Sequence, residues 1–318
     1  MTTITKTPTG TTEENRLVAD KWSDFARLRE TDPRYKRLFA MENPYLESLV
    51  NKTYFGGDCS LSLIKRHRPD MRFGRVLEIG CGPGSLSRTF AKNFFCGSID
   101  AFDIAPENIR LAREKAGAEG LRNINYYVGD ANSLELPAGK YDLIMVSQSL
   151  HHIQNLENLF CQAERSLTAG GLFWADDYCG PNRMQWTDKQ LYYINEILKI
   201  LPAKYRMRGD SPREKTAAER IPIEAFLRND PSEGVRALDI LPVARNYMDV
   251  RETVFWGGTI LYELLLYIVH NFDEKDPADR ALLEMIFFME HRLIKEGILE
   301  SNFVAFTGMR WARREYCL

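Results

Sequence analysis

The sequence has no closely spaced cysteine pair and no long apolar stretch. Its six cysteines form no Cys-x-x-Cys pair and no disulfide-framework spacing, which predicts reduced thiols in a cytoplasmic protein. The longest apolar run, residues 258–269, contains Glu263 and is too short to span a bilayer. Residues 1–14 are polar and threonine-rich and lack the apolar core of a signal peptide, so we expect a disordered tail there.

Neither sign of charge is in excess. The 318 residues include 42 Lys and Arg against 44 Asp and Glu, a formal net charge of −2. This balance argues against a general nucleic-acid scaffold, so we expect a small-molecule partner, with no nucleic acid and no membrane. Hydrophobic residues make up 44% of the chain, enough for a substantial core, and no internal repeat is evident. We expect one compact unit.

The most informative segment is residues 76–85, which read Val-Leu-Glu-Ile-Gly-Cys-Gly-Pro-Gly-Ser. Its apolar residues are typical of a buried strand that enters a tight turn and opens a helix. The glycines Gly80, Gly82 and Gly84 let the backbone turn sharply and leave no Cβ between it and a ligand. Helix-initiating amides then point into the resulting crevice. The segment therefore predicts a site for a nucleotide-like cofactor.

From residue 75 onwards, short apolar or β-branched runs alternate with amphipathic helical patterns. This alternation predicts parallel strands joined by right-handed crossovers, an α/β fold with a doubly wound sheet. Two late strands separated by a helical pair are expected to add an antiparallel edge. The predicted strands are residues 75–79, 98–103, 123–128, 141–147, 171–176, 248–256 and 302–309, and the predicted helices are residues 84–94, 106–118, 155–168, 186–200, 258–271 and 277–296.

The segments on either side of this core are expected to be helical. Breaks at Pro33, Pro44 and Gly56 interrupt the N-terminal helices, which we expect to cap the core. The C-terminal helices offer a face for a homodimer. The expected regions are a disordered tail (1–14), a helical cap (15–70), a cofactor-binding core (71–178), a region of helices and loops facing a substrate (179–247), and the last two strands with their helical pair (248–318).

Acidic residues stand where the strands of the core end. Asp103 ends the second strand, where its carboxylate can bind ribose hydroxyls, an arrangement that also suits NAD. Asp130 follows the third strand and can accept a hydrogen bond from an adenine amino group. Glu78 lies in a strand that is otherwise buried, where it can meet the amino-acid end or the sulfonium region of a cofactor. Together with the polar residues from Ser147 to His152, these acids favour S-adenosylmethionine over NAD.

This combination resembles the class I S-adenosylmethionine-dependent methyltransferases in order and spacing. The resemblance implies a Rossmann-like seven-stranded sheet of order 3-2-1-4-5-7-6, S-adenosylmethionine as the cofactor, and a packing role for Gly84. The motifs are Glu-x-Gly-x-Gly-x-Gly at 78–84, Asp103, Gly129-Asp130, Tyr141-Asp142 and Ala169-Gly170-Gly171. The expected cofactor-binding residues are Glu78, Gly80, Cys81, Gly82, Asp103, Ile104, Asp130, Ala131 and Ser147.

Residues beyond the fifth strand are candidates for binding the methyl acceptor. The segments 178–188, 230–234 and 257–259 resemble a bacterial subgroup of the family, some of whose members stand beside glycan or natural-product genes. Aromatic side chains here can stack on a sugar or a planar substrate, although a polar loop and helix packing would explain them equally well. The expected acceptor-binding residues are Tyr178, Asn182, Arg183, Trp186 and Tyr262.

The pair His151-His152 supplies the candidate general base, because imidazole titrates near neutral pH. The sequence does not decide which histidine faces the acceptor, and a structural role for one of them is equally compatible. Asp177, at the end of the fifth strand, is expected to orient a histidine or the acceptor hydroxyl. No metal is expected, because no ligand spacing marks a site.

The sequence therefore predicts a methyltransferase that acts on a hydroxyl of a small molecule or a sugar, with a histidine as base. Transfer to an amine is the alternative, and a non-catalytic cofactor-binding subunit is the alternative from another class. An NAD(P)-dependent oxidoreductase is disfavoured, since the chain has no Tyr-x-x-x-Lys pair and its turn reads G-x-G-x-G rather than G-x-G-x-x-G.

Overall fold

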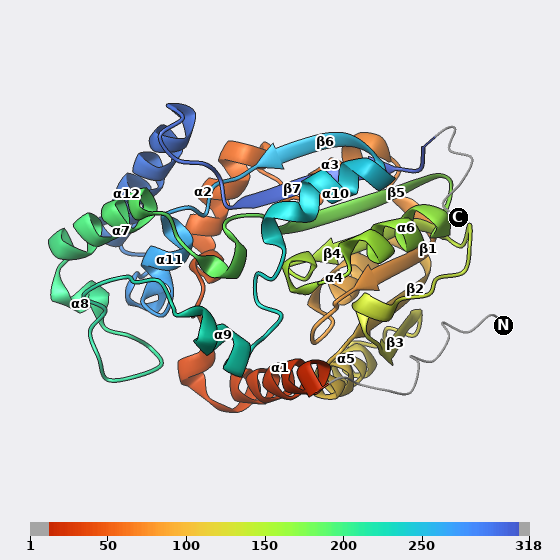
Figure 1. Ribbon diagram of the computed structural model, residues 1–318, viewed down its shortest axis with the longest axis horizontal. Helices are drawn as coiled ribbons and strands as arrows, with labels where there is room; N and C mark the ends of the chain where they lie inside the picture. The colour runs from red at the N-terminus through yellow and green to blue at the C-terminus, as the bar shows by residue number, and fades with distance from the viewer. Residues whose placement is uncertain (1–12, 312–318) are drawn as a thin grey trace.

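A seven-stranded sheet of order β3-β2-β1-β4-β5-β7-β6 forms the centre of the computed structural model, which describes residues 13–311 (Figure 1). The first five strands pair in parallel, whereas β7 runs antiparallel to both β5 and β6. The sheet order and the antiparallel edge predicted from the sequence are confirmed. The strands are β1 (Arg72–Ile79), β2 (Phe95–Asp103), β3 (Ile124–Val128), β4 (Tyr141–Ser147), β5 (Leu167–Tyr178), β6 (Asp249–Phe255) and β7 (Phe303–Met309).

Helices cover both faces of the sheet, and successive strand residues pack against opposite layers. In β1, Val76 joins the hydrophobic cluster that includes α3 and α4, and Leu77 joins the one that includes α6 and α10. The helices are α1 (Glu13–Thr31), α2 (Pro44–Phe55), α3 (Ser62–His67), α4 (Ser85–Asn93), α5 (Pro106–Ala118), α6 (Leu156–Ser166), α7 (Asp188–Ile200), α8 (Ala203–Arg206), α9 (Ile223–Asn229), α10 (Ile240–Tyr247), α11 (Leu261–Leu265) and α12 (Pro277–Lys295).

The N-terminal helices break where the sequence indicates. Asn43 caps α2 through its side chain and Pro44 occupies the first helical turn, while Gly56, with φ +74°, ends the helix. The expected tail is too long at its C-terminal end, because Glu13 and Glu14 belong to α1. Acidic residues suit a first helical turn, where they face the positive end of the helix dipole. The rest of the expected tail, residues 1–12, lies outside the described residues.

The helix predicted over residues 258–271 is wrong in its extent. Only the five residues of α11 are α-helical, and a 3-10 turn follows at Val269–Asn271. Tyr267 adopts φ +65°, and its amide donates to the carbonyl of Leu38 instead of continuing the helix. The Glu290 carboxylate accepts hydrogen bonds from the amides of Gly258 and Leu261. Glu290 thus satisfies amides at the start of the segment, which have no helical acceptor, whereas the carbonyl of Leu38 takes an amide that a continued helix would have bonded internally.

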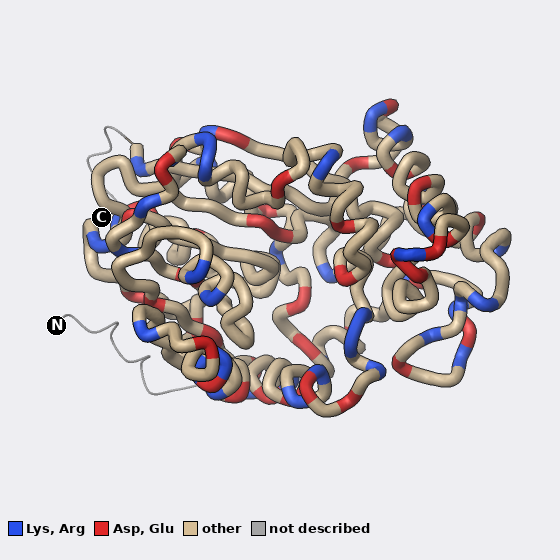
Figure 2. The backbone as a smooth tube through the Cα atoms, turned by 180° about the vertical axis from the view of Figure 1, so that it is seen from behind, with Lys and Arg blue, Asp and Glu red and all other residues tan. Residues whose placement is uncertain are grey.

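The largest hydrophobic cluster joins the part of the cap after residue 39, the sheet and the C-terminal helices. Leu46 of the cap, Phe73 of the sheet and Leu283 of α12 belong to the same buried set. Basic and acidic residues are interspersed along the described part of the chain, as the blue and red bands on the α1 segment in Figure 2 illustrate. Within residues 13–311, no helix combines the length and apolar character that a membrane crossing requires.

Candidate functional site

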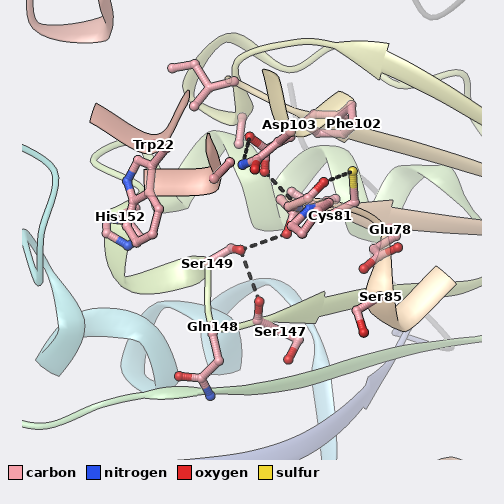
Figure 3. A pocket seen from close by; sticks show the side chains of 18 of the residues that line it. Trp22, Glu78, Cys81, Ser85, Phe102, Asp103, Ser147, Gln148, Ser149 and His152 are labelled. Atoms are coloured by element: carbon pink, nitrogen blue, oxygen red, sulfur yellow. Dashed lines mark hydrogen bonds between the residues drawn. The ribbon is translucent and has the colours of Figure 1, made fainter. Parts of the chain in front are cut away.

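A cavity of about 680 Å³ opens beside the glycine turn, at the ends of β1, β2 and β4 and beneath α1. All nine cofactor-binding residues predicted from the sequence line it: Glu78, Gly80, Cys81, Gly82, Asp103, Ile104, Asp130, Ala131 and Ser147. Figure 3 shows Trp22 of α1 lying against His152 at one end of this cavity and Glu78 near Ser85 at the other.

The glycine turn needs glycine for different reasons at different positions. Gly80, Gly82 and Gly84 all have positive φ, at +68°, +51° and +73°. A Cβ on Gly80 would stand 2.2 Å from the hydroxyl oxygen of Ser149, and one on Gly84 would stand 2.5 Å from that of Tyr126. A Cβ on Gly82 would meet nothing within 4 Å. Gly80 and Gly84 therefore allow close packing within the protein, whereas Gly82 faces open space.

Asp103 ties the turn to the start of α5. One carboxylate oxygen accepts from the amide of Gly82 at 2.9 Å, and the other accepts from the amide of Ala105 at 2.9 Å and from Asn108. A carboxylate oxygen accepts more than one hydrogen bond, so Asp103 retains capacity for a ligand hydroxyl. These bonds explain why this acid stands beside the turn.

Asp130 connects the end of β3 to α1. Its carboxylate accepts from the side chain of Asn15 at 2.7 Å, and its other oxygen accepts from the amide of Asn132 at 2.9 Å. Lys115 of α5 also bonds Glu30 of α1 at 2.5 Å. α1 is therefore held across the mouth of the cavity by polar contacts with the strand ends and with α5.

Glu78 is a buried carboxylate with an unused oxygen. It is 2% exposed, and its Oε2 has no hydrogen-bond partner in the structure. Burial raises the pKa of Glu78 to about 8. An unpaired buried carboxylate oxygen is costly, so this atom favours a ligand that brings a positive charge or an N–H group to the cavity.

Asp177 organises the segment that follows β4. The carboxylate is fully buried and accepts from the amides of Ser149 and Leu150, each at 2.7 Å, and it contacts Nδ1 of His151 at 2.6 Å. His151, in the 3-10 turn η4 (Leu150–His152), is only 6% exposed and does not line the cavity. Asp177 and His151 therefore form a buried pair beneath the site.

The two histidines lie in opposite electrostatic environments. Burial disfavours a charged His151, but the carboxylates of Asp177 and Glu233 outweigh it and raise its pKa well above the ordinary value. Burial and the neighbouring His151 charge lower the pKa of His152, which lines the cavity. Glu233 is buried as well, but the charges of the two nearby imidazoles and a hydrogen bond from His151 lower its pKa. Near neutral pH this combination leaves His151 charged and His152 neutral.

His151, His152 and Glu233 have the ligand types of a metal site. Each offers one ligand atom, and the three atoms lie within 4.8 Å of one another. Positive groups already face the Glu233 carboxylate, since Nε2 of His151 lies 3.5 Å from it and Nζ of Lys21 lies 3.9 Å from it. A divalent ion would have to displace or discharge these groups. The expectation that no metal takes part stays a prediction.

None of the five acceptor-binding residues predicted from the sequence lines the cavity. Tyr178 donates to the carbonyl of Pro181, and Asn182 accepts from the amide of Leu238. Arg183 donates to backbone carbonyls of the 231–233 segment. Trp186 packs against the rings of Tyr178 and Tyr262. The polar atoms of these side chains thus bond backbone groups and the rings pack on one another, as the alternative of a polar loop and helix packing predicts. Their role in binding the acceptor stays a prediction.

Several residues at the site were missed by sequence reasoning. Ser232 and Trp22 line the cavity. Asp230 and Glu233 lie beside these lining residues, and Lys21 of α1 forms an ion pair with Asp230. The one available signal was the run of residues 230–234, which reads Asp-Pro-Ser-Glu-Gly and places three polar residues beside a proline and a glycine, which are typical of turns. Nothing in the sequence marked the face of α1 that lines the cavity, because its aromatic and charged residues also suit ordinary helix packing.

Part of this chain resembles known methyltransferases. Residues 76–171 match the model of a methyltransferase domain. Malonyl-[acyl-carrier protein] O-methyltransferase 2 of Ilyobacter polytropus is 30% identical over 168 residues, which is 46% of this chain and 63% of that protein.

Two solved structures share the fold. Geranyl diphosphate methyltransferase in complex with GPP and sinefungin has a TM-score of 0.55 at 12% identity, covering 94% of this chain and 100% of its own. Haemonchus contortus phosphoethanolamine N-methyltransferase 2 in complex with S-adenosyl-L-methionine has a TM-score of 0.50 at 17% identity. The match covers 90% of this chain and 60% of that structure's chain. The chain spans less than two thirds of the length of the first curated relatives it matches.

Proposed function

We propose that this chain, in which residues 76–171 form a class I S-adenosylmethionine-dependent methyltransferase domain, moves a methyl group to a hydroxyl of a small molecule or a sugar. The observation that carries the proposal is a single cavity that joins the glycine turn to the neutral histidine His152. A cofactor bound along the turn would share this cavity with an acceptor placed beside the histidine.

The residues that line the cavity match the parts of S-adenosylmethionine. Asp103 would bind the ribose hydroxyls and Asp130 the adenine amino group. The turn from Gly80 to Gly82 would hold the amino-acid end, and the unpaired oxygen of Glu78 would face its positive charge. Cys81, Ile104, Ala131 and Ser147 complete the lining of this half of the cavity.

S-adenosylmethionine supplies a methyl group bonded to a positively charged sulfur, which is an activated leaving group. The acceptor oxygen forms the new bond to the methyl carbon as the carbon–sulfur bond breaks, and the electron pair of that bond stays on sulfur. The chain holds the two reactants in line and keeps water away. His152 takes the proton of the acceptor hydroxyl.

His152 suits the role of base better than His151. It lines the cavity, and burial together with the charge of His151 lowers its pKa, so it reaches the acceptor in the unprotonated form. His151 is buried between the carboxylates of Asp177 and Glu233 and serves to hold η4 in place. Asp177 acts through His151 and through the amides of the same turn.

α1 closes the acceptor side of the cavity. Val18, Trp22, Phe25 and Ala26 present apolar surface to the lining, and Trp22 packs edge-to-face on His152 with ring centroids 5.1 Å apart. An acceptor in this half of the cavity would lie against aromatic rings. This environment supports a planar or sugar-like acceptor and a dry site for the transfer.

Transfer to an amine is the second candidate. Ajmaline N-methyltransferase of Rauvolfia serpentina, 28% identical over 103 residues, carries that activity in its name. A neutral amine would use the same alignment and lose its proton to the same base. Assaying hydroxyl-bearing sugars and phenols beside matched amines separates the two candidates, with release of S-adenosylhomocysteine as the readout.

The base assignment is tested with His152→Ala. We expect this variant to bind S-adenosylmethionine as tightly as the wild type by calorimetry, and to lose about 100-fold in kcat, the usual contribution of a general base. His291→Ala is the matched control, because His291 contacts Tyr54 and neither residue lines the cavity.

Two outcomes would contradict the proposal. Wild-type turnover in His152→Ala would remove the histidine base. A wild-type protein that binds S-adenosylmethionine but methylates none of the acceptors would favour the non-catalytic alternative.

A further inference from the structure

One hydroxyl group links His152 to a carboxylate. Oγ of Ser232 lies 2.6 Å from Oδ1 of Asp230 and 3.0 Å from Nδ1 of His152. A serine hydroxyl carries one hydrogen, and an ionised carboxylate only accepts. Ser232 therefore donates to Asp230, and the bond to the imidazole requires Nδ1 of His152 to be the donor.

We infer that Asp230 and Ser232 are positioning residues that hold neutral His152 in the tautomer with hydrogen on Nδ1. Nε2 then keeps its lone pair and is the atom that takes the acceptor's proton. The inference rests on the proposed function for the role of that proton, but the tautomer itself follows from the hydrogen-bond partners alone.

The choice of tautomer matters because a neutral imidazole has only one basic nitrogen. If the hydrogen were on Nε2, the nitrogen with the lone pair would face Ser232 and not the acceptor. A fixed oxygen acceptor at Nδ1 removes this second form. The same logic operates in serine hydrolases, where an aspartate on Nδ1 of a histidine fixes the tautomer of the base.

Asp230 acts through Ser232 and not directly. Its Oδ2 lies 4.0 Å from Nδ1 of His152, too far for a hydrogen bond. Its Oδ1 accepts from both the amide and the hydroxyl of Ser232, which fixes the serine rotamer. The carboxylate thereby decides the direction in which the hydroxyl donates.

α1 completes this arrangement. Nζ of Lys21 lies 2.7 Å from Oδ2 of Asp230, whose side chain is only 2% exposed. The same ammonium group lies over the ring of Trp22. Trp22 in turn packs on His152. The helix that closes the cavity therefore also holds the Asp230 carboxylate in place, so we assign Lys21 to the same positioning set.

The tautomer is measured by nitrogen NMR of protein labelled with ¹⁵N-histidine, at a pH where His152 is neutral. The spectrum of His152→Ala identifies the signals. In the wild type we expect Nδ1 to carry the hydrogen. Ser232→Thr keeps a hydroxyl and should keep this form, whereas Ser232→Ala should shift His152 towards the form with hydrogen on Nε2.

Lys21 is tested by a second matched pair. Lys21→Arg keeps a cation beside Asp230 and should preserve the wild-type tautomer signals. Lys21→Met removes the cation while keeping an unbranched stem on Trp22, and should increase the fraction of the Nε2–H form. Calorimetry with S-adenosylmethionine on the two Ser232 variants should give wild-type affinity and so exclude damage to the cofactor site.

Turnover separates positioning from a purely structural role. With an acceptor that the wild type methylates, Ser232→Ala should lose about tenfold or more in kcat relative to Ser232→Thr, because the wrong tautomer cannot accept the proton. An Nε2–H form in the wild type, an unchanged tautomer in Ser232→Ala, or equal kcat for the two serine variants would overturn the inference. Failure of the proposed function differs from all three, since it appears as no methyl transfer by the wild type.

Discussion

At the scale of single residues, Glu78 carries the clearest dependence on pH. Its carboxyl group titrates at about 8 in the folded protein, because burial favours the neutral form, against an ordinary value of 4.5. Between these two pH values the folded protein keeps a proton that the unfolded chain has lost. The stability of the ligand-free protein therefore falls as pH rises from about 4.5 towards 8. Above pH 8 both states have lost the proton, so Glu78 adds little further change in stability.

We expect Glu78→Gln to remove much of this dependence. Thermal unfolding of the ligand-free variant and of the wild type, compared at pH 6 and pH 9, should show the smaller decrease in melting temperature for the variant. The reason is that a buried glutamine has no proton to lose. An equal decrease in both proteins would contradict the burial argument.

The same variant tests the proposed contact between Glu78 and the positive end of the cofactor. A bound cation favours the carboxylate, so wild-type affinity for S-adenosylmethionine should rise as pH increases from 7 to 9. Calorimetry of Glu78→Gln corrects for the titration of the cofactor's own amino group, because the ligand is the same. A parallel pH dependence in the two proteins would place the cofactor's charge elsewhere.

The residues of the glycine turn and the strand ends were predictable from the sequence for a physical reason. Gly80, Asp103 and Asp130 follow strands that pair in parallel, so their positions along the chain already bring them to one edge of the sheet. Trp186 and Tyr262 were assigned to the acceptor because they are aromatic residues beyond the fifth strand. Their packing against one another could not be read from the sequence.

At the scale of elements, α1 is a cover for the cavity more than a part of the core. Few of its residues are buried, and among the described residues the largest hydrophobic cluster has no member in 13–39. The helix nevertheless lines the cavity with Trp22 and Phe25, and Asn15 reaches Asp130 at the end of β3. Its contribution should therefore be to binding and not to folding.

Deleting residues 1–31 tests this role. We expect a folded protein whose affinity for S-adenosylmethionine falls by about tenfold, since loss of one charged-group hydrogen bond and of apolar contact area costs on the order of 1–2 kcal/mol. Calorimetry measures the affinity, and deletion of residues 1–12 alone is the control. Wild-type affinity in the longer deletion would show that α1 is not a cover.

Among the elements, α11 is shorter than the local sequence pattern predicts because of tertiary contacts. The apolar run over residues 258–271 suits a helix by periodicity. Glu290 of α12 instead accepts the amides at its start, and the carbonyl of Leu38 takes the amide of Tyr267. Neither partner is near in sequence, so no window of the chain could reveal the change.

At the scale of the whole molecule, the hydrophobic clusters argue for a single cooperative unit. Cap residues such as Leu46 and C-terminal residues such as Leu283 pack into the same cluster as Phe73 of the sheet. Exposing the cap part of this cluster would also uncover apolar surface of the sheet. We therefore expect the cap, core and C-terminal regions to be segments of one folding unit.

We expect a single unfolding transition that shifts as one when the cofactor is added. At a concentration of 100 times its dissociation constant, S-adenosylmethionine should add about 2.7 kcal/mol to the unfolding free energy, because it binds only the folded state. Differential scanning calorimetry measures both effects. Two transitions, only one of which moves with the ligand, would show that the cap and the core unfold separately.

The sequence by itself determined the sheet and the cofactor edge, because strand periodicity, the glycine turn and the acids at strand ends are local features whose placement follows from chain connectivity. Only the tertiary structure decided the acceptor side. Lys21 and Asp230 are 209 positions apart, and Ser232 and His152 are 80 apart, so packing alone brings them together. It also decided that His152 lines the cavity while His151 is buried, because the carboxylates that distinguish them come from β5 and the 230–234 loop.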